Sequence, residues 1–160
     1  MRNVFVTLCL CGFIIYALKK TTLKKGGKKM NNFNENDAKA AILFVKNKYG
    51  NEIAKKVEQI MRLETGNFKS KQYIQTGSAG MEVGKWRIPG NLTNGTIDFK
   101  DNNDGHTGHF IVWRSVTDFA VFLAEYIVRY KGNFARWNTT DKAKQTEYST
   151  KVNSIQSKFV

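Results

Sequence analysis

Glu64 is the residue whose type and spacing best suit acid–base chemistry. The stretch before it carries one apolar helical face, with offsets of four, seven and eight residues from its first member: Ile53, Val57, Ile60 and Met61. Glu64 follows Ile53 by eleven residues, almost three turns, so its side chain should point in nearly the same direction. Ionising a carboxyl group at the edge of an apolar core is costly, so we expect a raised pKa. A general acid for glycoside cleavage requires such a group.

The residues after Glu64 predict where its helix ends. Thr65 and Gly66 follow directly, so we expect the helix to stop there and to leave Glu64 at the rim of the core. A glutamate at a helix end can equally form a structural ion pair with a Lys or Arg. Spacing alone leaves both interpretations open.

Other polar clusters give weaker signals. The segment 101–105 (Asp-Asn-Asn-Asp-Gly) is rich in oxygen ligands, but it lacks the alternating pattern and the bidentate Glu of a calcium loop. His106 and His109 lie three residues apart with no third ligand suggested. We therefore expect a solvated turn here, and we predict neither a metal site nor a cofactor.

Aromatic residues are the remaining candidates for ligand contact. Trp86, Trp113 and Trp137 could stack on sugar rings or could simply belong to the core. Tyr126 and Tyr130 lie on an apolar helical stripe, which favours burial, although a hydroxyl group could still reach a groove.

The elements that must position these residues are mostly helices. Asn36 or Asp37 can cap a first helix that ends at Gly50, and Asn51 can cap the helix that carries Glu64. A short helix is expected over 70–75, short strands over 86–88 and 109–113, and a helix from the Ser115 capping pattern to Gly132. A last helix from about residue 140 should bury four residues: Tyr148, Val152, Ile155 and Phe159. Turn signals occur between the strands: Pro89-Gly90, Asn94-Gly95 and Asp104-Gly105.

Length and composition indicate one globular domain with a basic surface. The chain has 160 residues, of which 41% are hydrophobic, so wholesale disorder is excluded. Residues 1–30 hold seven basic residues and no acid, and 31–160 hold 19 basic against 13 acidic, giving +7 and +6. Such a charge suits nucleic acid, an anionic membrane or an anionic wall polymer. Cys9 and Cys11 are the only cysteines, so the domain has no disulfide framework.

The first residues predict a membrane anchor. Residues 4–18 form an apolar run with one Arg before it and six lysines after it, the reverse of a cleaved signal peptide. We expect an uncleaved anchor over 1–18, a Lys/Gly/Asn-rich linker over 19–36 and a domain over 37–160. An atypical cleaved signal and a buried helix are the alternatives.

Across residues 37–158 the chain resembles the lysozyme-like superfamily, in particular cell-wall glucosaminidase and lytic transglycosylase domains of autolysins and phage lytic enzymes. Leu63-Glu64-Thr65-Gly66 is similar to the catalytic Glu motif, and Gly80-Met81 to the Gly-apolar pair at the groove floor. Trp113-Arg114-Ser115 and the segment 148–152 resemble the step into the next helix and the final helix. The sequence departs from the family pattern at two places. Residues 77–79 replace an Asn-rich, aromatic stretch, and Trp137 stands at about the position where the family has a tyrosine in its substrate groove.

The resemblance implies a mostly α, α+β lysozyme-like fold with a small β-excursion, and cleavage of peptidoglycan glycan strands. Glu64 would be the general acid/base, and Glu82 is a tentative second carboxylate, with Asp98, Asp101 and Asp104 as further acids. Substrate contacts would come from five positions: Ser78, Gly80, Met81, Tyr126 and Trp137. If no second carboxylate reaches the site, a lytic transglycosylase is implied, in which one Glu serves as acid and then base.

This resemblance also implies a location and leaves alternatives. We expect attachment through residues 4–18 to a virion internal membrane or to the bacterial cell envelope. A non-catalytic wall-binding or virion structural protein is an open alternative. Specific nucleic-acid binding is disfavoured, because 20 of the 26 basic residues are Lys and no recognised motif interleaves them with aromatics.

Overall fold

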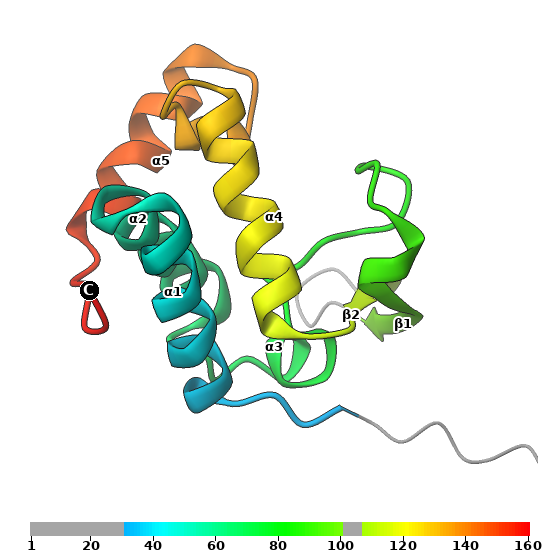
Figure 1. Ribbon diagram of the computed structural model, residues 1–160. Coiled ribbons are helices and arrows are strands. Elements are labelled where there is room, and N and C mark those ends of the chain that lie inside the picture. Colours follow the sequence, from blue (N-terminus) through cyan, green and yellow to red (C-terminus); the bar gives the residue numbers. More distant parts are fainter. Residues whose placement is uncertain (1–30, 101–106) are drawn as a thin grey trace, which may run out of the picture.

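Helices dominate the fold, and a small sheet lies to one side of them (Figure 1). The computed structural model describes residues 31–100 and 107–160. In chain order the elements are α1 (Glu35–Tyr49), α2 (Asn51–Thr65), α3 (Lys71–Thr76), η1 (Gly90–Leu92), β1 (Thr93–Lys100), β2 (Thr107–Trp113), α4 (Val116–Arg129), η2 (Phe134–Trp137) and α5 (Lys142–Ser154). The coarse prediction of an α+β, mostly α fold is confirmed.

Helix ends follow local capping chemistry. The side chains of Ser70, Ser115 and Asp141 accept hydrogen bonds from the first backbone N–H groups of α3, α4 and α5. The first helix begins earlier than predicted, because Asn34 rather than Asn36 or Asp37 is its cap. Gly50 ends α1 as expected and is also the cap of α2, so that Asn51 is the first residue of α2 rather than its cap.

The sheet differs from the prediction in its first strand. Residues 86–88 form no strand, and β1 instead spans Thr93–Lys100 and pairs antiparallel with β2. Asn94-Gly95, which the sequence predicted as a turn, lies inside β1 where the register shifts between Thr93 and Thr96. The second predicted strand, 109–113, lies within β2. The segment 81–83 runs along the other edge of β2, with Ile111 N–H bonded to Met81 C=O at 2.8 Å.

The core lies between α1, α2 and α4, which pack against one another (Figure 1). Small and branched side chains of α1 and α4 are fully buried there: Ala38, Ala41, Ile42, Val45, Ala120, Leu123, Ala124 and Ile127. The aromatic rings of Trp113 and Phe119 extend this core toward η2. The helices thereby form a rigid frame for the C-terminal end of α2, where Glu64 lies.

The last residues of the chain correct another expectation. Helix α5 ends at Ser154, so Ile155 and Phe159 lie after the helix instead of on its buried face. Tyr148 and Val152 are buried as predicted. The tail folds back along α2, where Gln59 Nε2 donates to the backbone oxygen of Ile155 at 2.7 Å.

The predictions for the amino-terminal residues fall mostly outside the described residues. The anchor predicted over 1–18 and most of the linker lie there. The end of that linker belongs to the fold, because Phe33 N–H donates to Ile74 C=O at 2.9 Å and the ring packs against the core. Among the helices that the structure describes, none has the length and apolar character needed to cross a membrane.

Candidate functional site

Glu64 lies in the last turn of α2 with its side chain exposed. The expectation that it shares the core-facing stripe is wrong, for a geometric reason. Ile53, from which the direction was extrapolated, is itself only half buried, and the buried face centres on Ala54, Met61 and Thr65. Glu64 therefore lies at the edge of that face and is open to solvent.

A buried tyrosine fixes the Glu64 carboxylate. Tyr148 of α5 donates its hydroxyl hydrogen to Glu64 Oε1 at 2.6 Å, and the tyrosine is only 6% exposed. Burial, together with the Glu64 charge and this hydrogen bond, raises the pKa of Tyr148 well above its ordinary value, so the hydroxyl stays protonated and remains a donor. Glu64 Oε2 accepts no hydrogen bond within the described part of the chain. One oxygen is thus held and the other is free to react. The structural ion pair expected as the alternative role of Glu64 is absent among the described residues.

The turn after Glu64 is backbone-strained. Gly66, Asn67 and Phe68 all adopt left-handed conformations, with φ of 57°, 59° and 65°. A non-glycine residue pays about 1–2 kcal/mol in this region, so the surrounding contacts must hold the turn. Thr65 Oγ1 accepts from Phe68 N–H at 2.8 Å, and Asn67 N–H donates to Arg62 C=O at 2.9 Å. The end of α2 is therefore fixed in place on both sides of Glu64.

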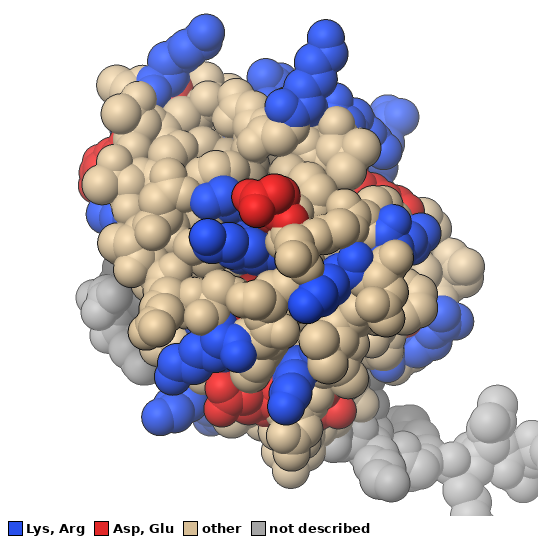
Figure 2. All heavy atoms as spheres, turned by 60° about the vertical axis from the view of Figure 1, so that its left-hand side comes forward, with Lys and Arg blue, Asp and Glu red and all other residues tan. Residues whose placement is uncertain are grey.

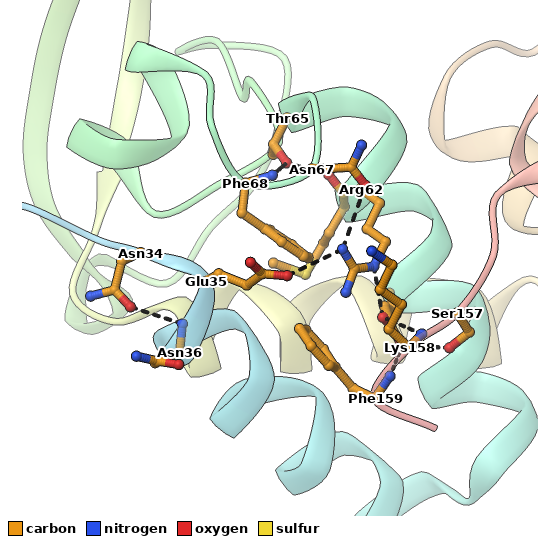
Figure 3. A network of polar contacts seen from close by, with 12 residues as sticks. Asn34, Glu35, Asn36, Arg62, Thr65, Asn67, Phe68, Ser157, Lys158 and Phe159 are labelled. Atoms are coloured by element: carbon orange, nitrogen blue, oxygen red, sulfur yellow. Dashed lines mark hydrogen bonds and ion pairs between the residues drawn. The ribbon is translucent and has the colours of Figure 1, made fainter.

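A buried charge network supports this turn from the other side of α2 (Figure 3). Arg62 Nε donates to Glu58 Oε1 at 2.7 Å, and both side chains are almost fully buried. The guanidinium of Arg62 lies against the rings of Phe68 and Phe159, at 4.8 and 4.5 Å from their centroids, and these two rings stack on each other at 6.1 Å. Arg62 Nη1 also lies 3.4 Å from Glu35 Oε1. The network ties α1, α2 and the tail together.

Hydrogen bonds control the charge of Glu58. Burial alone would raise its pKa, but hydrogen bonds from Ser157, from Arg62 and from the backbone N–H groups of Lys158 and Phe159 outweigh burial and hold the pKa below its ordinary value. Glu58 is therefore ionised at neutral pH. This pair was not predicted, because its only signal in the sequence is the i, i+4 spacing, which usually marks exposed ion pairs.

A groove of about 780 Å³ opens between α4, η2 and the segment 85–92. Its floor is aromatic: Trp86 contacts Trp137 at 4.5 Å and Tyr126 at 5.5 Å between ring centroids. Burial raises the pKa of Tyr126, whose hydroxyl donates to the backbone oxygen of Arg136 at 2.9 Å. Two of the predicted substrate-contact residues, Tyr126 and Trp137, thus line one groove, together with Trp86, which the sequence singled out for stacking.

Glu64 does not line this groove, but α5 connects the two. Asn138, Thr139 and Thr140 line the groove and lead directly into α5, whose cap is Asp141. Tyr148 comes six residues after the first residue of α5, about 9 Å along the helix axis. The element that borders the groove therefore also holds the Glu64 carboxylate.

The remaining predicted contacts lie below the surface. Ser78 is 1% exposed, with its hydroxyl 3.1 Å from that of Thr76, and Met81 is 1% exposed in the core. Gly80 is half buried and has φ +74°. Neither the Ser78 hydroxyl nor the Met81 side chain is presented to a ligand in this structure, so these residues support a surface instead of forming it.

The candidate second carboxylates are occupied elsewhere. Glu82 Oε2 lies 2.6 Å from Lys85 Nζ, and Asp98 Oδ1 lies 2.6 Å from His109 Nδ1 on the exposed hairpin. Neither contacts Glu64. Asp101, Asp104 and His106 lie outside the described residues. Within 31–100 and 107–160, no group of three His, Cys, Asp or Glu side chains could hold a metal ion. The carboxylate that does line the groove, Glu125, was not predicted.

Comparison with known proteins gives no assignment. No family model, no curated protein and no solved structure matches this chain. A functional conclusion therefore rests on the residues and their geometry.

The distribution of charge bears on the nucleic-acid alternative. Figure 2 shows Lys and Arg side chains at several separate places on one face, with acidic side chains among them. A nucleic-acid groove would instead favour a continuous basic stripe. On this face the charge suits diffuse attraction to a polyanion.

Proposed function

We propose that this protein cleaves the glycan strands of peptidoglycan, with Glu64 as general acid and then general base. The observation that carries the proposal is the exposed Glu64 carboxylate at a fixed helix end, with one oxygen held by the buried Tyr148 hydroxyl at 2.6 Å. Similarity of the Leu63–Gly66 motif to the catalytic motif of the lysozyme-like superfamily supports this role.

The reaction that we favour needs one carboxyl group. Protonated Glu64 donates its proton to the glycosidic oxygen as the C1–O bond breaks, and the leaving sugar departs with a new hydroxyl group. The 6-hydroxyl of the same muramyl sugar then attacks C1, and its proton passes to the Glu64 carboxylate. The products are an anhydro-sugar end and a regenerated acid, as in a lytic transglycosylase. No second carboxylate contacts Glu64 in the described chain, which favours this route over hydrolysis.

The aromatic groove supports a glycan ligand. Sugar rings present C–H faces that pack on aromatic side chains, and Trp86, Tyr126 and Tyr130 line the groove. A strand held there would extend past the loop before α5 toward Glu64. Attachment of the chain to a virion or envelope membrane through residues 4–18 is part of the same proposal.

The test is product analysis after digestion of purified peptidoglycan by the full chain and by Glu64→Gln. We expect wild type to release fragments with anhydro-sugar ends and the variant to release none, because an amide cannot donate and recover the proton. Glu64 is exposed, so the free energy of unfolding of the variant, measured in urea, should stay within about 0.5 kcal/mol of wild type. Glu147→Gln, which removes another exposed helix carboxylate, is the matched control and should cleave normally.

Other products would change the conclusion. Reducing ends in place of anhydro ends would indicate a hydrolase and direct attention to Glu82 and Glu125 as second carboxylates. If folded wild type released nothing, the cleavage proposal would be overturned, and the non-catalytic wall-binding or virion structural alternative would take its place.

A further inference from the structure

The groove carries more positive charge than a neutral sugar requires. Its charged lining residues are four cations and one carboxylate: Lys85, Arg87, Arg129, Arg136 and Glu125. All three arginines are exposed. Guanidinium groups bind carboxylates and phosphates through paired N–H donors, so this lining suits an anionic ligand.

Two of the arginines are free to bind. The guanidinium groups of Arg87 and Arg129 form no hydrogen bond or ion pair with any residue that the structure describes. Arg136 lies over the Tyr130 ring at 4.5 Å, which holds its plane and leaves its N–H edge for a ligand. Lys85, in contrast, is already paired with Glu82 at 2.6 Å.

The one carboxylate of the lining is partly neutralised by its neighbours. Tyr49 donates its hydroxyl hydrogen to Glu125 Oε1 at 3.0 Å, and Lys48 Nζ lies 3.9 Å from the same oxygen. Glu125 is thus directed toward α1, and no described arginine of the groove pairs with it. An incoming anion would meet the arginines in the groove without competition from this group.

We infer that the groove selects glycans whose sugars carry carboxylate groups, with Arg87 and Arg129 binding the carboxylate beside the aromatic floor at Trp86. This inference rests on the proposed function, because it takes a wall glycan as the ligand. In peptidoglycan the carboxylate is that of the lactyl group where the muramyl sugar carries no stem peptide, and elsewhere it belongs to the stem peptide itself. Phosphate groups of other wall polymers present similar oxygens to a guanidinium, so the test includes both sources.

To measure binding apart from cleavage, the full chain carrying Glu64→Gln is titrated in mild detergent with four probes. The probes are a disaccharide of N-acetylglucosamine and N-acetylmuramic acid with its lactyl carboxylate free, the same disaccharide as its carboxamide, a neutral N-acetylglucosamine oligomer, and a glycerol phosphate oligomer. We expect the free carboxylate to bind about tenfold more tightly than the carboxamide, as one charge-assisted pair would give. The phosphate oligomer should bind more weakly, because it offers no sugar ring for the aromatic floor.

Variants locate the selectivity. Arg87→Gln and Arg129→Gln should each remove most of the tenfold preference and leave binding of the neutral oligomer unchanged. Arg114→Gln removes an equal charge from an exposed arginine outside the groove that pairs with Asp118, and it should keep the preference. Far-UV circular dichroism checks that each variant is folded.

Three results would overturn the inference: equal binding of carboxylate and carboxamide, equal loss in Arg114→Gln, or tightest binding of the phosphate oligomer. Failure of the cleavage proposal is distinguishable. Carboxylate selectivity in a chain whose wild type releases no products would leave this inference standing as that of a wall-binding groove. Cleavage without selectivity would reject only the inference.

Discussion

Tyr148 supplies a hydrogen-bond donor that stays protonated under the conditions in which the proposed reaction would need Glu64 to give up and recover a proton. Burial raises the pKa of the tyrosine, so the hydroxyl group remains protonated and donates its hydrogen bond at acidic and neutral pH alike. Because the donor comes from α5 and the carboxylate from α2, their hydrogen bond fixes the carboxylate relative to a second helix. In the proposed reaction Tyr148 would be a positioning residue, since it would act only through Glu64.

Tyr148→Phe tests this role. Loss of the hydroxyl group leaves Glu64 in place but lets its carboxylate rotate, so we expect kcat to fall about tenfold, the value of one hydrogen bond to a charged group, with KM nearly unchanged. The free energy of unfolding should fall by no more than about 1 kcal/mol, because water can replace the donor at the exposed carboxylate. Steady-state kinetics on soluble peptidoglycan fragments and urea unfolding measure the two effects.

Tyr73→Phe is the matched control, because it also removes one buried hydroxyl group, which donates to the backbone oxygen of Asn34 at 2.9 Å. This control should leave kcat unchanged. A rise in KM with unaltered kcat in Tyr148→Phe would assign the hydroxyl group to substrate binding and contradict the positioning role.

Helix α2 divides its chemistry between two edges of its buried face. Glu64 occupies one edge and is exposed, while Glu58 and Arg62 occupy the other and are buried against the tail. Removing one partner of a buried ion pair leaves the other charge uncompensated, which costs far more than the net contribution of the pair. The stability of α2 should therefore depend on Glu58, and the catalytic role that we propose for this helix should depend on Glu64.

Glu58→Gln should lower the free energy of unfolding by about 3 kcal/mol at neutral pH, because Arg62 loses its buried partner. The effect should also depend on pH. The folded-state pKa of Glu58 is below its ordinary value, so its contribution is complete above that ordinary value and is lost as pH falls through the folded-state pKa. Wild type should thus lose more stability than the variant on acidification from pH 7 to pH 3. Urea unfolding at several pH values measures both curves.

Glu147→Gln serves as the control, since Glu147 also pairs with a cation one turn away, Lys151, but is exposed. The hydrogen bond with Lys151 also lowers the pKa of Glu147, but the pair is exposed and screened by solvent, so the unfolding curve of this variant should stay close to wild type at every pH. Parallel pH curves for wild type and Glu58→Gln would show that Glu58 does not contribute to acid unfolding.

Locally coded elements were predictable from the sequence, and those that depend on distant contacts were not. Ser115 and Gly66 determine helix ends through atoms within a few residues, and both were predicted correctly. The short helix predicted over 70–75 lies one residue later, because Ser70 is its cap. Asn94-Gly95 suggested a turn, but pairing with β2 makes it part of a strand.

The candidate site shows the same division. The position of Glu64 at a helix end follows from Gly66, whereas its exposure depends on where the buried face of α2 centres. Tyr148 was predicted as a core residue of the last helix, but its hydrogen bond joins residues 84 apart in sequence. No local sequence pattern predicts a contact between residues so far apart in the chain. The burial of Glu58 likewise depends on a tail about a hundred residues later.

At the scale of the whole molecule, the core that the structure describes is built from residues after the first thirty. Its earliest contact is that of Phe33 with Ile74, and every buried core residue lies between Ala38 and Val152. The described lining of the groove and the described contact of Glu64 likewise come from residues after this point. A membrane anchor over residues 4–18 stays a prediction from their apolar composition.

Deleting residues 1–30 should give a protein that is soluble without detergent, with the same urea midpoint as the full chain, because no described core contact is lost. The full chain should float with anionic lipid vesicles and the shortened chain should not. A deletion of 19–30 alone keeps the apolar run and removes the six lysines, so it separates membrane insertion from electrostatic attraction. This variant should still float with the vesicles, and it should do so in high salt as well, where the attraction of lysines to anionic lipid is screened. Aggregation of the 31–160 chain, or a lowered urea midpoint, would instead place residues 4–18 in the core and reject the anchor.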